Sequence, residues 1–422
     1  MQPTENAPAT PVTVLMVGVG GYGHYFLQTL REQMRPERAR LCGIVDPLAH
    51  RSEYYPRWIE DRIPIFDDIE AYYQAGRQAD LSVIASPIHF HAHQSCVALN
   101  NGSHVLCEKP IAPVVQEADL LSRTAEGAGR WCMIGYQWSF SHAIQNLKRD
   151  IRRGLFGEPL RLKTLIFWPR DDAYYQRNGW AGRIKDNCGR WILDSPANNA
   201  MAHYLHNLFY LLGEETASSA VPSDVVAELY RANPIENFDT AVCRAHTNRG
   251  TELLFYGTHA TRGDQDPMFQ LEFENAVIRY NDPTPEIVVR TRQDECWTYG
   301  SPEDDPQFKK LFDAVHAVHA LDPLLCGPAA ARAQCVCVNG MQESVPVIAS
   351  FSTSMVQRDE EKKRWLVVGL DDTLRECYRQ GVLPSELHIP WASQGKSVDL
   401  RGYDHYPSRP ANKSKRERSA TE

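Results

Sequence analysis

Residues 12–34 read VTVLMVGVGGYGHYFLQTLREQM, and this stretch is the key to the architecture. It begins with an apolar run, Val12–Val17, which is typical of a strand buried on both faces of a parallel sheet. The run ends at glycines spaced as G-x-G-x-x-G, and the apolar residues of the next segment lie on one stripe of a helix. Because the N-terminus of such a helix attracts phosphate, the stretch predicts the first βα unit of a dinucleotide-binding Rossmann domain.

Each glycine of this turn has a separate role. Gly18 permits the tight turn, Gly20 lets the backbone approach a pyrophosphate, and Gly23 lets the helix pack close to the strand. We predict that the cofactor contacts the whole turn, which comprises Gly18, Gly20, Gly21, Tyr22 and Gly23.

A carboxylate follows at the expected distance. The next apolar run, residues 41–45, ends at Asp46, about twenty residues past the last glycine. A carboxylate there accepts both ribose hydroxyls of an adenosine and repels a 2′-phosphate, so Asp46 favours NAD over NADP. Nearby Arg51 leaves NADP as the second choice. The alternative interpretation is an ordinary βα turn with a helix-capping aspartate.

The composition is that of a globular protein. A length of 422 residues exceeds what one compact core takes up, so two domains with extra segments are expected. The net charge of −8 argues against a general nucleic-acid role. We find neither a secretory signal nor an apolar run of about eighteen residues, so neither export nor a membrane span is expected. Eleven scattered cysteines suit reduced thiols in the cytoplasm.

Strands and helices alternate over residues 11–135, as in a doubly wound parallel sheet of the Rossmann type. Ligands of such sheets lie beyond the carboxyl ends of the strands, here the loops after residues 17, 85 and 107. Residues 1–10 are polar and are expected to form a flexible leader. The predicted strands are 12–17, 41–45, 81–85, 105–107 and 132–135, and the predicted helices include 67–75, 91–101 and 115–126.

A second, α+β domain is expected over residues 136–357. Period-two alternation in residues 225–231 indicates a large, mostly antiparallel sheet with one face packed on helices and the other face open. An open sheet face suits self-association, so a homodimer or homotetramer is expected. The predicted helices are 141–153, 200–212, 307–321 and 329–344, and the predicted strands are 159–168 and seven shorter runs between residues 225 and 299.

Residues 358–422 are expected to be a C-terminal extension. Residues 370–379 are predicted to form a helix that ends at Gly381, a typical C-cap residue. The last residues, with several lysines and arginines from Arg409 onward, are expected to be a disordered, solvated tail.

The sequence VLCEKPIA places Glu108, Lys109 and Pro110 at the carboxyl end of a strand, beside the predicted cofactor. A lysine there can hydrogen-bond a substrate hydroxyl, and its pKa should fall near the positive nicotinamide ring. Glu108 is expected to hold Lys109 in place. The alternative is an exposed salt bridge that caps a loop.

Together these motifs resemble the Gfo/Idh/MocA family of nicotinamide-dependent oxidoreductases. The resemblance covers residues 12–350 and includes the loop SPIHFHAH (residues 86–93) and the segment GYQWSF (residues 135–140). It implies that Lys109 lies near the reactive nicotinamide carbon and that the Lys109–Pro110 bond can be cis. It also implies cofactor contacts from Ser86, Pro87, His89, His91, Glu108 and Lys109.

The segment NNAMAHYLHNLFYLLG, residues 198–213, aligns with the active-site helix of that family. A typical member carries an acid, then a histidine, then an aspartate, where this chain has Asn199, His203 and His206. His203 is therefore the predicted proton acceptor, whereas Asn199 can orient a hydroxyl but cannot act as a base. The three residues would share one helix face and line one pocket. Structural histidines are the alternative for His203 and His206.

The segment GYQWSF supplies two further predicted substrate contacts, Tyr136 and Trp138. Relatives often carry basic residues where this chain has Trp138 and Ser139, which suggests a less charged pocket whose rings stack on a sugar. Core packing is the alternative for Tyr136. The long loop over residues 168–190 is a candidate substrate lid, in which Arg170, Asp172 and Arg183 could bond hydroxyls.

Three histidines alternate at His89, His91 and His93. On a strand they would share one face and could bind zinc. Because the stretch is expected to open a helix, which scatters the rings, no metal site is predicted.

The sequence as a whole predicts a cytoplasmic NAD-dependent dehydrogenase of a sugar, cyclitol or derivative, in which His203 and Lys109 act on a secondary hydroxyl. Its partner is a small molecule, with neither nucleic acid nor membrane expected. Two alternatives stay open. Some relatives of this fold cleave glycosides with tightly held NAD through transient oxidation at C3, and a non-catalytic NAD-binding sensor or scaffold would explain the missing acid at Asn199.

Overall fold

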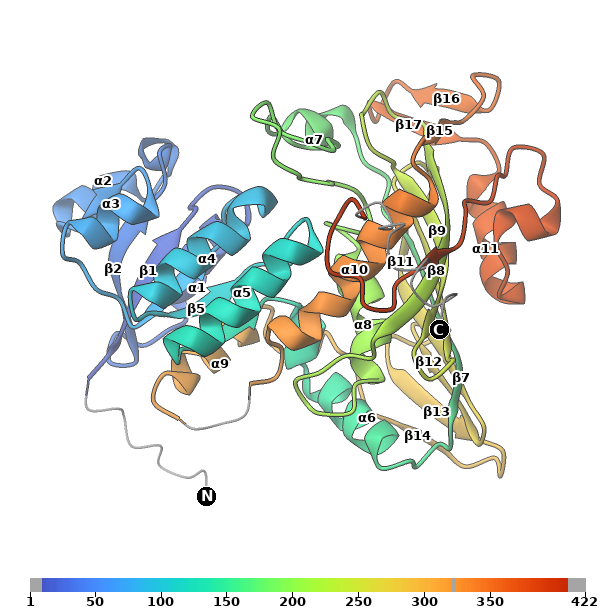
Figure 1. Ribbon diagram of the computed structural model, residues 1–422, viewed down its shortest axis with the longest axis horizontal. Coiled ribbons are helices and arrows are strands. Elements are labelled where there is room, and N and C mark those ends of the chain that lie inside the picture. Colours follow the sequence, from blue (N-terminus) through green and yellow to red (C-terminus); the bar gives the residue numbers. More distant parts are fainter. Residues whose placement is uncertain (1–9, 321–323, 409–422) are drawn as a thin grey trace, which may run out of the picture.

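A computed structural model describes residues 10–320 and 324–408 of the chain. Two sheets lie at opposite sides of the molecule, with helices between them (Figure 1). The first is a parallel sheet of six strands in the order β3-β2-β1-β4-β5-β6, the classical order of a Rossmann domain. Its strands are β1 (Val12–Val17), β2 (Ala39–Val45), β3 (Ile65–Phe66), β4 (Leu81–Ile84), β5 (His104–Cys107) and β6 (Cys132–Ile134).

The helices of this domain cover both faces of the sheet, which explains the uninterrupted apolar runs. Val14, Leu15 and Val17 of β1 are all buried, and Phe26 and Leu30 of the first helix pack into the same core. The predicted strands are confirmed to within two residues, and β3 was missed because it has only two residues. The helices are α1 (Tyr22–Glu32), α2 (Tyr55–Glu60), α3 (Ile69–Gln74), α4 (His91–Asn100) and α5 (Val115–Ala128).

The second sheet is large and mostly antiparallel, as predicted, with the order β14-β13-β12-β11-β7-β10-β9-β8-β15 and β18 also paired to β8. Among its pairs, β7 with β10 and β15 with β8 are parallel. Its strands are β7 (Pro159–Phe167), β8 (Pro222–Arg231), β9 (Thr240–Thr247), β10 (Glu252–Thr258), β11 (Gln265–Phe273), β12 (Ala276–Tyr280), β13 (Ile287–Thr291), β14 (Cys296–Thr298), β15 (Ala349–Ser350) and β18 (Val398–Asp399).

One face of this sheet packs on helices that also touch the Rossmann domain, so a single core runs through both domains. Asn339 in the last of these helices accepts a hydrogen bond from the Val115 N–H at the start of α5 (2.9 Å) and thereby joins the domains. The helices are α6 (His142–Arg152), α8 (Ala202–Leu211), α9 (Lys309–Ala317) and α10 (Pro328–Ser344), and a short α7 (Asp172–Gln176) lies in the loop after β7.

The opposite face of the sheet is not open over β7, β8, β9 and β10, contrary to the sequence prediction. Along β10, Leu253 and Phe255 face the main core, while Leu254 and Tyr256 face a second core built with the C-terminal extension. The extension covers them with the hairpin β16 (Val356–Asp359)–β17 (Arg364–Val367) and with α11 (Leu370–Gln380) (Figure 1). Self-association through this part of the face, as expected from the sequence, is therefore blocked by the chain's own helix.

The end of the extension returns to the Rossmann domain. The Tyr406 N–H donates to the Gln116 side chain of α5 (3.0 Å), and the Gln116 amide donates back to the Tyr406 carbonyl (2.9 Å). The predicted helix end at Gly381 is confirmed, with this glycine in a left-handed conformation (φ +72°). The predicted basic tail lies outside the described residues, and so does the predicted leader except for Thr10.

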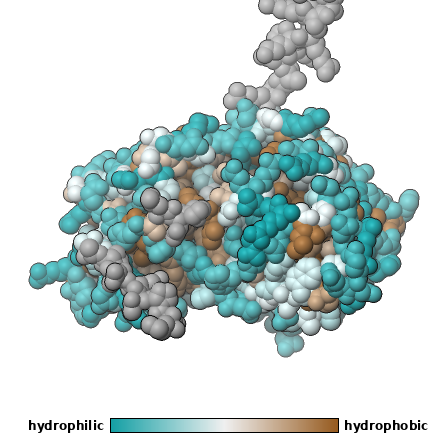
Figure 2. Space-filling view, turned by 90° about the horizontal axis from the view of Figure 1, so that it is seen from below, coloured by the Kyte–Doolittle hydropathy of each residue, from teal (hydrophilic) through white to brown (hydrophobic). Residues whose placement is uncertain are grey.

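The surface in Figure 2 is mostly hydrophilic, with small separate hydrophobic patches. In the part of the chain that the structure covers, no helix combines the length and apolar character that crossing a membrane would require. All eleven cysteines are free thiols.

Candidate active site

The glycine turn after β1 has the shape that a pyrophosphate site needs. Gly18 has φ +82°, and a Cβ added to it would lie 2.7 Å from the Ser86 backbone nitrogen. A Cβ on Gly23 would lie 2.1 Å from the Gly18 carbonyl oxygen, so only glycine allows α1 to start this close to β1. A Cβ on Gly20 would meet nothing within 4 Å, which leaves space beside the backbone. The Gly23 N–H donates to the Gly20 carbonyl (3.0 Å), but no side chain caps α1 at Gly21, so a phosphate has no side-chain competitor at this helix N-terminus.

Asp46 at the end of β2 is tied to this turn. Its Oδ2 accepts from the Val19 N–H (2.8 Å), and its Oδ1 accepts from the Leu48 N–H (2.8 Å). Each carboxylate oxygen has a second lone pair, so the group retains acceptor capacity for ribose hydroxyls. The residues present thus fit a dinucleotide.

Tyr22, the fourth predicted contact of the turn, is turned partly toward the second domain. Its ring lies 5.5 Å from the ring of Phe308 and 4.8 Å from the ammonium of Lys310, measured to the ring centroid. The residue is still 36% exposed, so part of it remains accessible to a ligand.

The loop after β4 is held by a buried histidine. His91 has its Nδ1 2.7 Å from the Pro110 carbonyl oxygen and its Nε2 2.9 Å from the Ser86 carbonyl oxygen. It therefore joins the loop after β4 to the loop after β5. Ser86 and Pro87, which are expected to contact the cofactor, are half-buried. Burial lowers the pKa of His91, and the two carbonyls act in the opposite direction.

His89, in the loop after β4, lies next to the candidate lid, residues 168–190. Its ring packs on Phe90 (4.3 Å between centroids), and its Nε2 lies 3.9 Å from Asp186 Oδ2 of the lid. Burial lowers the pKa of His89 to about 4, so the ring is neutral at pH 7. His93 is paired with Glu70 instead, at 2.6 Å. The three alternating histidines thus have separate partners, and the described residues contain no group of three metal-ligating side chains.

Lys109 reaches from the Rossmann domain into the second domain. The Lys109–Pro110 bond is cis, as the family resemblance implies. The Lys109 ammonium donates to the Asn199 backbone oxygen (2.8 Å) and to Asn199 Oδ1 (3.2 Å). Burial lowers the pKa of Lys109 to about 8, partly offset by the carboxylates of Glu108 and Asp194. The group is therefore cationic at pH 7 and titrates just above it.

Glu108 has a different role from the predicted one. Its carboxylate pairs with the buried ammonium of Lys310 in α9, and only the Lys109 backbone N–H reaches it (3.2 Å). Glu108 therefore fixes α9 and the Lys109 backbone, whereas the ammonium of Lys109 is held by Asn199. Lys310 was missed because a lysine in an amphipathic helix is usually exposed.

Asn199 lies in the turn that precedes α8, and not in the helix as predicted, because α8 begins at Ala202. Its Nδ2 donates to Asp194 Oδ1 (2.8 Å), and Asp194 Oδ2 accepts from the Gly182 N–H (2.6 Å). Asp194 is 3% exposed, and burial raises its pKa. Asn199 is an amide, but it is hydrogen-bonded to a carboxyl group, that of Asp194. Sequence analysis missed Asp194 because it lies outside the aligned helix.

His203 is half-buried on α8 and retains an unused nitrogen. Its Nδ1 is buried and has no hydrogen-bond partner among the described residues. Burial and the charge of Lys109 hold the pKa of His203 well below its usual range, so the imidazole is neutral at pH 7. A neutral imidazole beside an ammonium can accept a proton from a hydroxyl that the ammonium binds.

Three predicted substrate contacts belong to the core. His206 is 1% exposed, lies flat against the Tyr136 ring (3.8 Å), and has its Nε2 3.0 Å from Ser139 Oγ. The Tyr136 hydroxyl donates to the Gln334 side chain of α10 (2.9 Å). Trp138 is 4% exposed and donates to Glu303 (2.6 Å). These expectations are corrected, because Tyr136 and His206 are enclosed in the core, and the Trp138 ring is packed against Tyr204 of α8 and against Phe269 and Tyr280 of the sheet.

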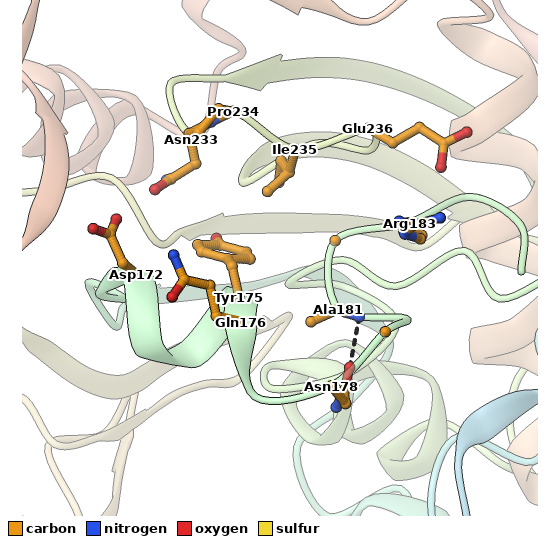
Figure 3. A pocket seen from close by; sticks show the side chains of 12 residues that line it. Asp172, Tyr175, Gln176, Asn178, Ala181, Arg183, Asn233, Pro234, Ile235 and Glu236 are labelled. Carbon is orange, nitrogen blue, oxygen red and sulfur yellow. Dashed lines mark hydrogen bonds between the residues drawn. The ribbon is translucent and has the colours of Figure 1, made fainter.

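A cavity of about 380 Å³ lies elsewhere in the second domain. Figure 3 shows it between α7 with the following loop and the segment 233–236, with the Asn178 side chain bonded to the Ala181 N–H (2.8 Å). Neither Lys109 nor His203 lines it. Gly182 lines the cavity and donates its N–H to Asp194, which does not line it. The cavity is therefore separate from the site of Lys109 and Asn199.

The strand order, the glycine turn and Asp46 define a dinucleotide-binding Rossmann domain, here joined to a domain built on a large mixed sheet. Residues 12–136 match the model of the Gfo/Idh/MocA family, described as an oxidoreductase family with an NAD-binding Rossmann fold. The NAD-binding domain of the chain is thus similar to this family over residues 12–136.

Individual dehydrogenases match part of the chain. The chain is 30% identical over 147 residues to 1-carboxy-3-chloro-3,4-dihydroxycyclo hexa-1,5-diene dehydrogenase of Comamonas testosteroni, covering 34% of this chain and 36% of that protein. It is 27% identical over 158 residues to scyllo-inositol 2-dehydrogenase (NAD(+)) of Bacillus subtilis strain 168, covering 36% and 43%. The match therefore spans less than half the length of these curated relatives.

Among solved structures, the WlbA dehydrogenase of Bordetella pertussis in complex with NADH and UDP-GlcNAcA superposes with a TM-score of 0.64. The sequence identity is 19%, and the superposition covers 80% of this chain and 97% of that chain. At this identity the likeness concerns the fold, and it extends over both domains.

Proposed function

We propose that the chain is an NAD-dependent dehydrogenase that oxidises a secondary hydroxyl of a sugar, cyclitol or derivative. One observation carries the proposal. The Lys109 ammonium of the Rossmann domain binds Asn199 (2.8 Å), which lies one turn before His203 in the second domain. The charge of this ammonium also reaches the neutral His203 imidazole and lowers its pKa, so both groups lie toward the carboxyl edge of the parallel sheet, where a dinucleotide is bound in this fold.

The turn from Gly18 to Gly23 would hold the pyrophosphate, and Asp46 the adenosine ribose. When bound, NAD would accept a hydride, that is, the hydrogen of the substrate carbon with both electrons of the C–H bond. Asp46 favours NAD over NADP because its carboxylate repels a 2′-phosphate.

The protein's own groups handle the proton and the charge. His203 takes the proton of the substrate hydroxyl, and the carbon becomes a carbonyl as its hydrogen departs with the electron pair. Lys109 donates to the substrate oxygen and stabilises the negative charge that develops there. Both roles are available at pH 7, since His203 is neutral and Lys109 is charged below about pH 8.

One chain supplies both groups, so the proposal does not depend on the homodimer or homotetramer expected from the sequence. The partner is a small polyhydroxylated molecule. Free thiols at every cysteine support a cytoplasmic location.

A screen of sugars and cyclitols, run with both NAD and NADP, tests the reaction by NADH or NADPH absorbance. Accumulation of NADH with a free sugar supports the dehydrogenase. Release of an aglycone without net NADH would instead indicate the glycoside-cleaving alternative, and tight NAD binding without turnover would indicate the sensor.

Lys109→Ala should reduce kcat by at least about a hundredfold while NAD affinity changes only severalfold, because the ammonium acts on the reacting oxygen. His203→Ala should behave similarly, since a lost general base costs roughly 10²–10⁴-fold. His93→Ala removes an imidazole that is paired with Glu70, away from Lys109, and is the matched control. Equal losses in turnover and NAD affinity for Lys109→Ala would contradict the assigned role.

A further inference from the structure

We propose that Arg170 and Arg177, in the loop between β7 and α8, bind an anionic group of the substrate, a carboxylate or a phosphate. The inference rests on the proposed function, because it concerns the same cleft and narrows the substrate class.

Two guanidinium groups gather on one aromatic ring. The Cζ of Arg177 lies 3.7 Å from the centroid of the Tyr174 ring, and the Cζ of Arg170 lies 4.7 Å from it. Arg177 also donates through Nη1 to the Tyr174 backbone carbonyl. Stacking on a ring stabilises a guanidinium and leaves its remaining in-plane N–H donors able to bind an anion. The pair is thus oriented by Tyr174.

The charge of Arg177 reaches the buried carboxyl group of Asp194 and lowers its pKa, but that group is already bonded to the Gly182 N–H and to Asn199. Among the described residues, neither arginine forms an ion pair within the 4.0 Å limit, and the buried Nε of Arg170 has no hydrogen-bond partner. The acid of α7, Asp172, is engaged by Arg358. By contrast, Arg190 in the same loop is paired with Asp186 at 2.7 Å. Two neighbouring cations with an unsatisfied buried donor are costly unless a ligand supplies the negative charge.

The pair belongs to the second domain and lies within electrostatic reach of Lys109. The Arg170 N–H donates to the His259 carbonyl (3.1 Å), which follows β10, so this arginine is anchored to the second sheet and not to the glycine turn. Arg177 lies close enough to the catalytic groups for its charge to lower the pKa values of Lys109 and Asp194. An anion bound by the pair would therefore lie on the second-domain side, toward Lys109 and Asp194, and away from the glycine turn.

The test compares matched ligands on the full chain saturated with NAD. Glucose, glucuronate and glucose 6-phosphate differ in the group at C6, and binding is measured by calorimetry and by thermal shift. We expect at least one anion to bind about tenfold or more tightly than glucose, as charge-assisted hydrogen bonds require. Preference for glucuronate identifies a carboxylate, and preference for glucose 6-phosphate identifies a phosphate.

Arg170→Gln and Arg177→Gln should each abolish the preference, whereas Arg177→Lys, which keeps the charge, should retain part of it. Lys185→Gln is the matched control, since it removes an exposed cation from the same loop that stacks on Trp191 (3.9 Å). Equal affinity of all three ligands, or an unchanged preference in both glutamine variants, would overturn the inference.

The two proposals fail separately. If neutral polyols are oxidised and the glutamine variants bind all three ligands as the wild type does, the dehydrogenase proposal is supported and the anion site is contradicted. If anions bind through the two arginines but no NADH forms with any ligand, the anion site is supported and the dehydrogenase proposal is contradicted.

Discussion

Asn199 connects two charged groups that belong to different parts of the chain. Its oxygens accept from the Lys109 ammonium, and its Nδ2 donates to Asp194 (2.8 Å). The carboxylate raises the pKa of Lys109 against the effect of burial, so Asp194 is a positioning residue that keeps the ammonium charged. An amide at position 199 is therefore compatible with catalysis.

Asp194→Asn should shift the pH dependence of kcat/KM. Lys109 acts as a cation, so activity falls as the pH rises through its pKa of about 8. Removal of the negative charge lowers that pKa, which moves the alkaline limb to lower pH. The variant should also lose about 1–3 kcal/mol of stability, since an NH₂ group replaces one of the two oxygens that accept from the Gly182 N–H and from Asn199, and so faces another donor.

A purely structural role for Asp194 would lower activity at every pH and leave the limb in place. Asp305→Asn is the control, because Asp305 likewise accepts a backbone N–H, that of His142 (2.7 Å), but at the start of α6. Its pH profile should match that of the wild type.

At the scale of elements, α9 is the connection between the second domain and the loop that carries Lys109. Lys310 of α9 is 1% exposed and pairs with Glu108, which is 6% exposed. Its ammonium also donates to the Gly135 carbonyl (3.2 Å) and lies over the Tyr22 ring. The helix thus holds the glycine turn and the Lys109 loop in one arrangement.

Lys310→Met should destabilise the protein by about 3–5 kcal/mol, because it leaves the Glu108 carboxylate buried without a partner. The expected decrease in the thermal midpoint is roughly 5–15 °C. Lys309→Met removes the neighbouring, more exposed pair with Asp313 (2.7 Å) and should cost about 1 kcal/mol or less. Calorimetry of both variants compares them directly.

The double variant Glu108→Gln, Lys310→Met separates charge from packing. It should recover most of the lost stability, since no unpaired charge remains buried. A double variant as unstable as Lys310→Met alone would assign the loss to packing of the lysine stem.

At the scale of the whole molecule, the C-terminal extension decides which surfaces are available to other molecules. Leu370, Leu374 and Cys377 of α11 lie on the sheet residues Leu254 and Tyr256 and close a second core. The remaining strands of that face carry polar residues such as Gln270 and Arg279. The chain therefore covers the apolar part of its own sheet.

Leu374→Asp should detach α11 and cause self-association that grows with concentration, because the side chain is fully buried and a carboxylate cannot remain there. Light scattering coupled to size-exclusion chromatography measures the change. Arg379→Asp, which adds the same group at an exposed position of α11, should leave the mass unchanged. An unchanged mass for Leu374→Asp would show that α11 does not protect the face.

Local patterns in the sequence were sufficient for most of the fold and for part of the site. The Rossmann strands, the glycine turn and the start of α1 follow from side-chain periodicity and backbone sterics, which act over a few residues. The motif around Lys109 and the histidine of α8 were also recognisable, because each lies in a short characteristic segment. NAD binding followed from the glycine turn together with Asp46.

Tertiary structure alone decided which groups meet. Glu108 and Lys310 are 202 residues apart in sequence, and Lys109 and Asn199 are 90 apart. Periodicity places a side chain on a face but does not name its partner, so His206 and Trp138 were expected in the cleft although the core encloses them. The same limit applies to α11, whose apolar stripe predicts a buried face without indicating the sheet that buries it.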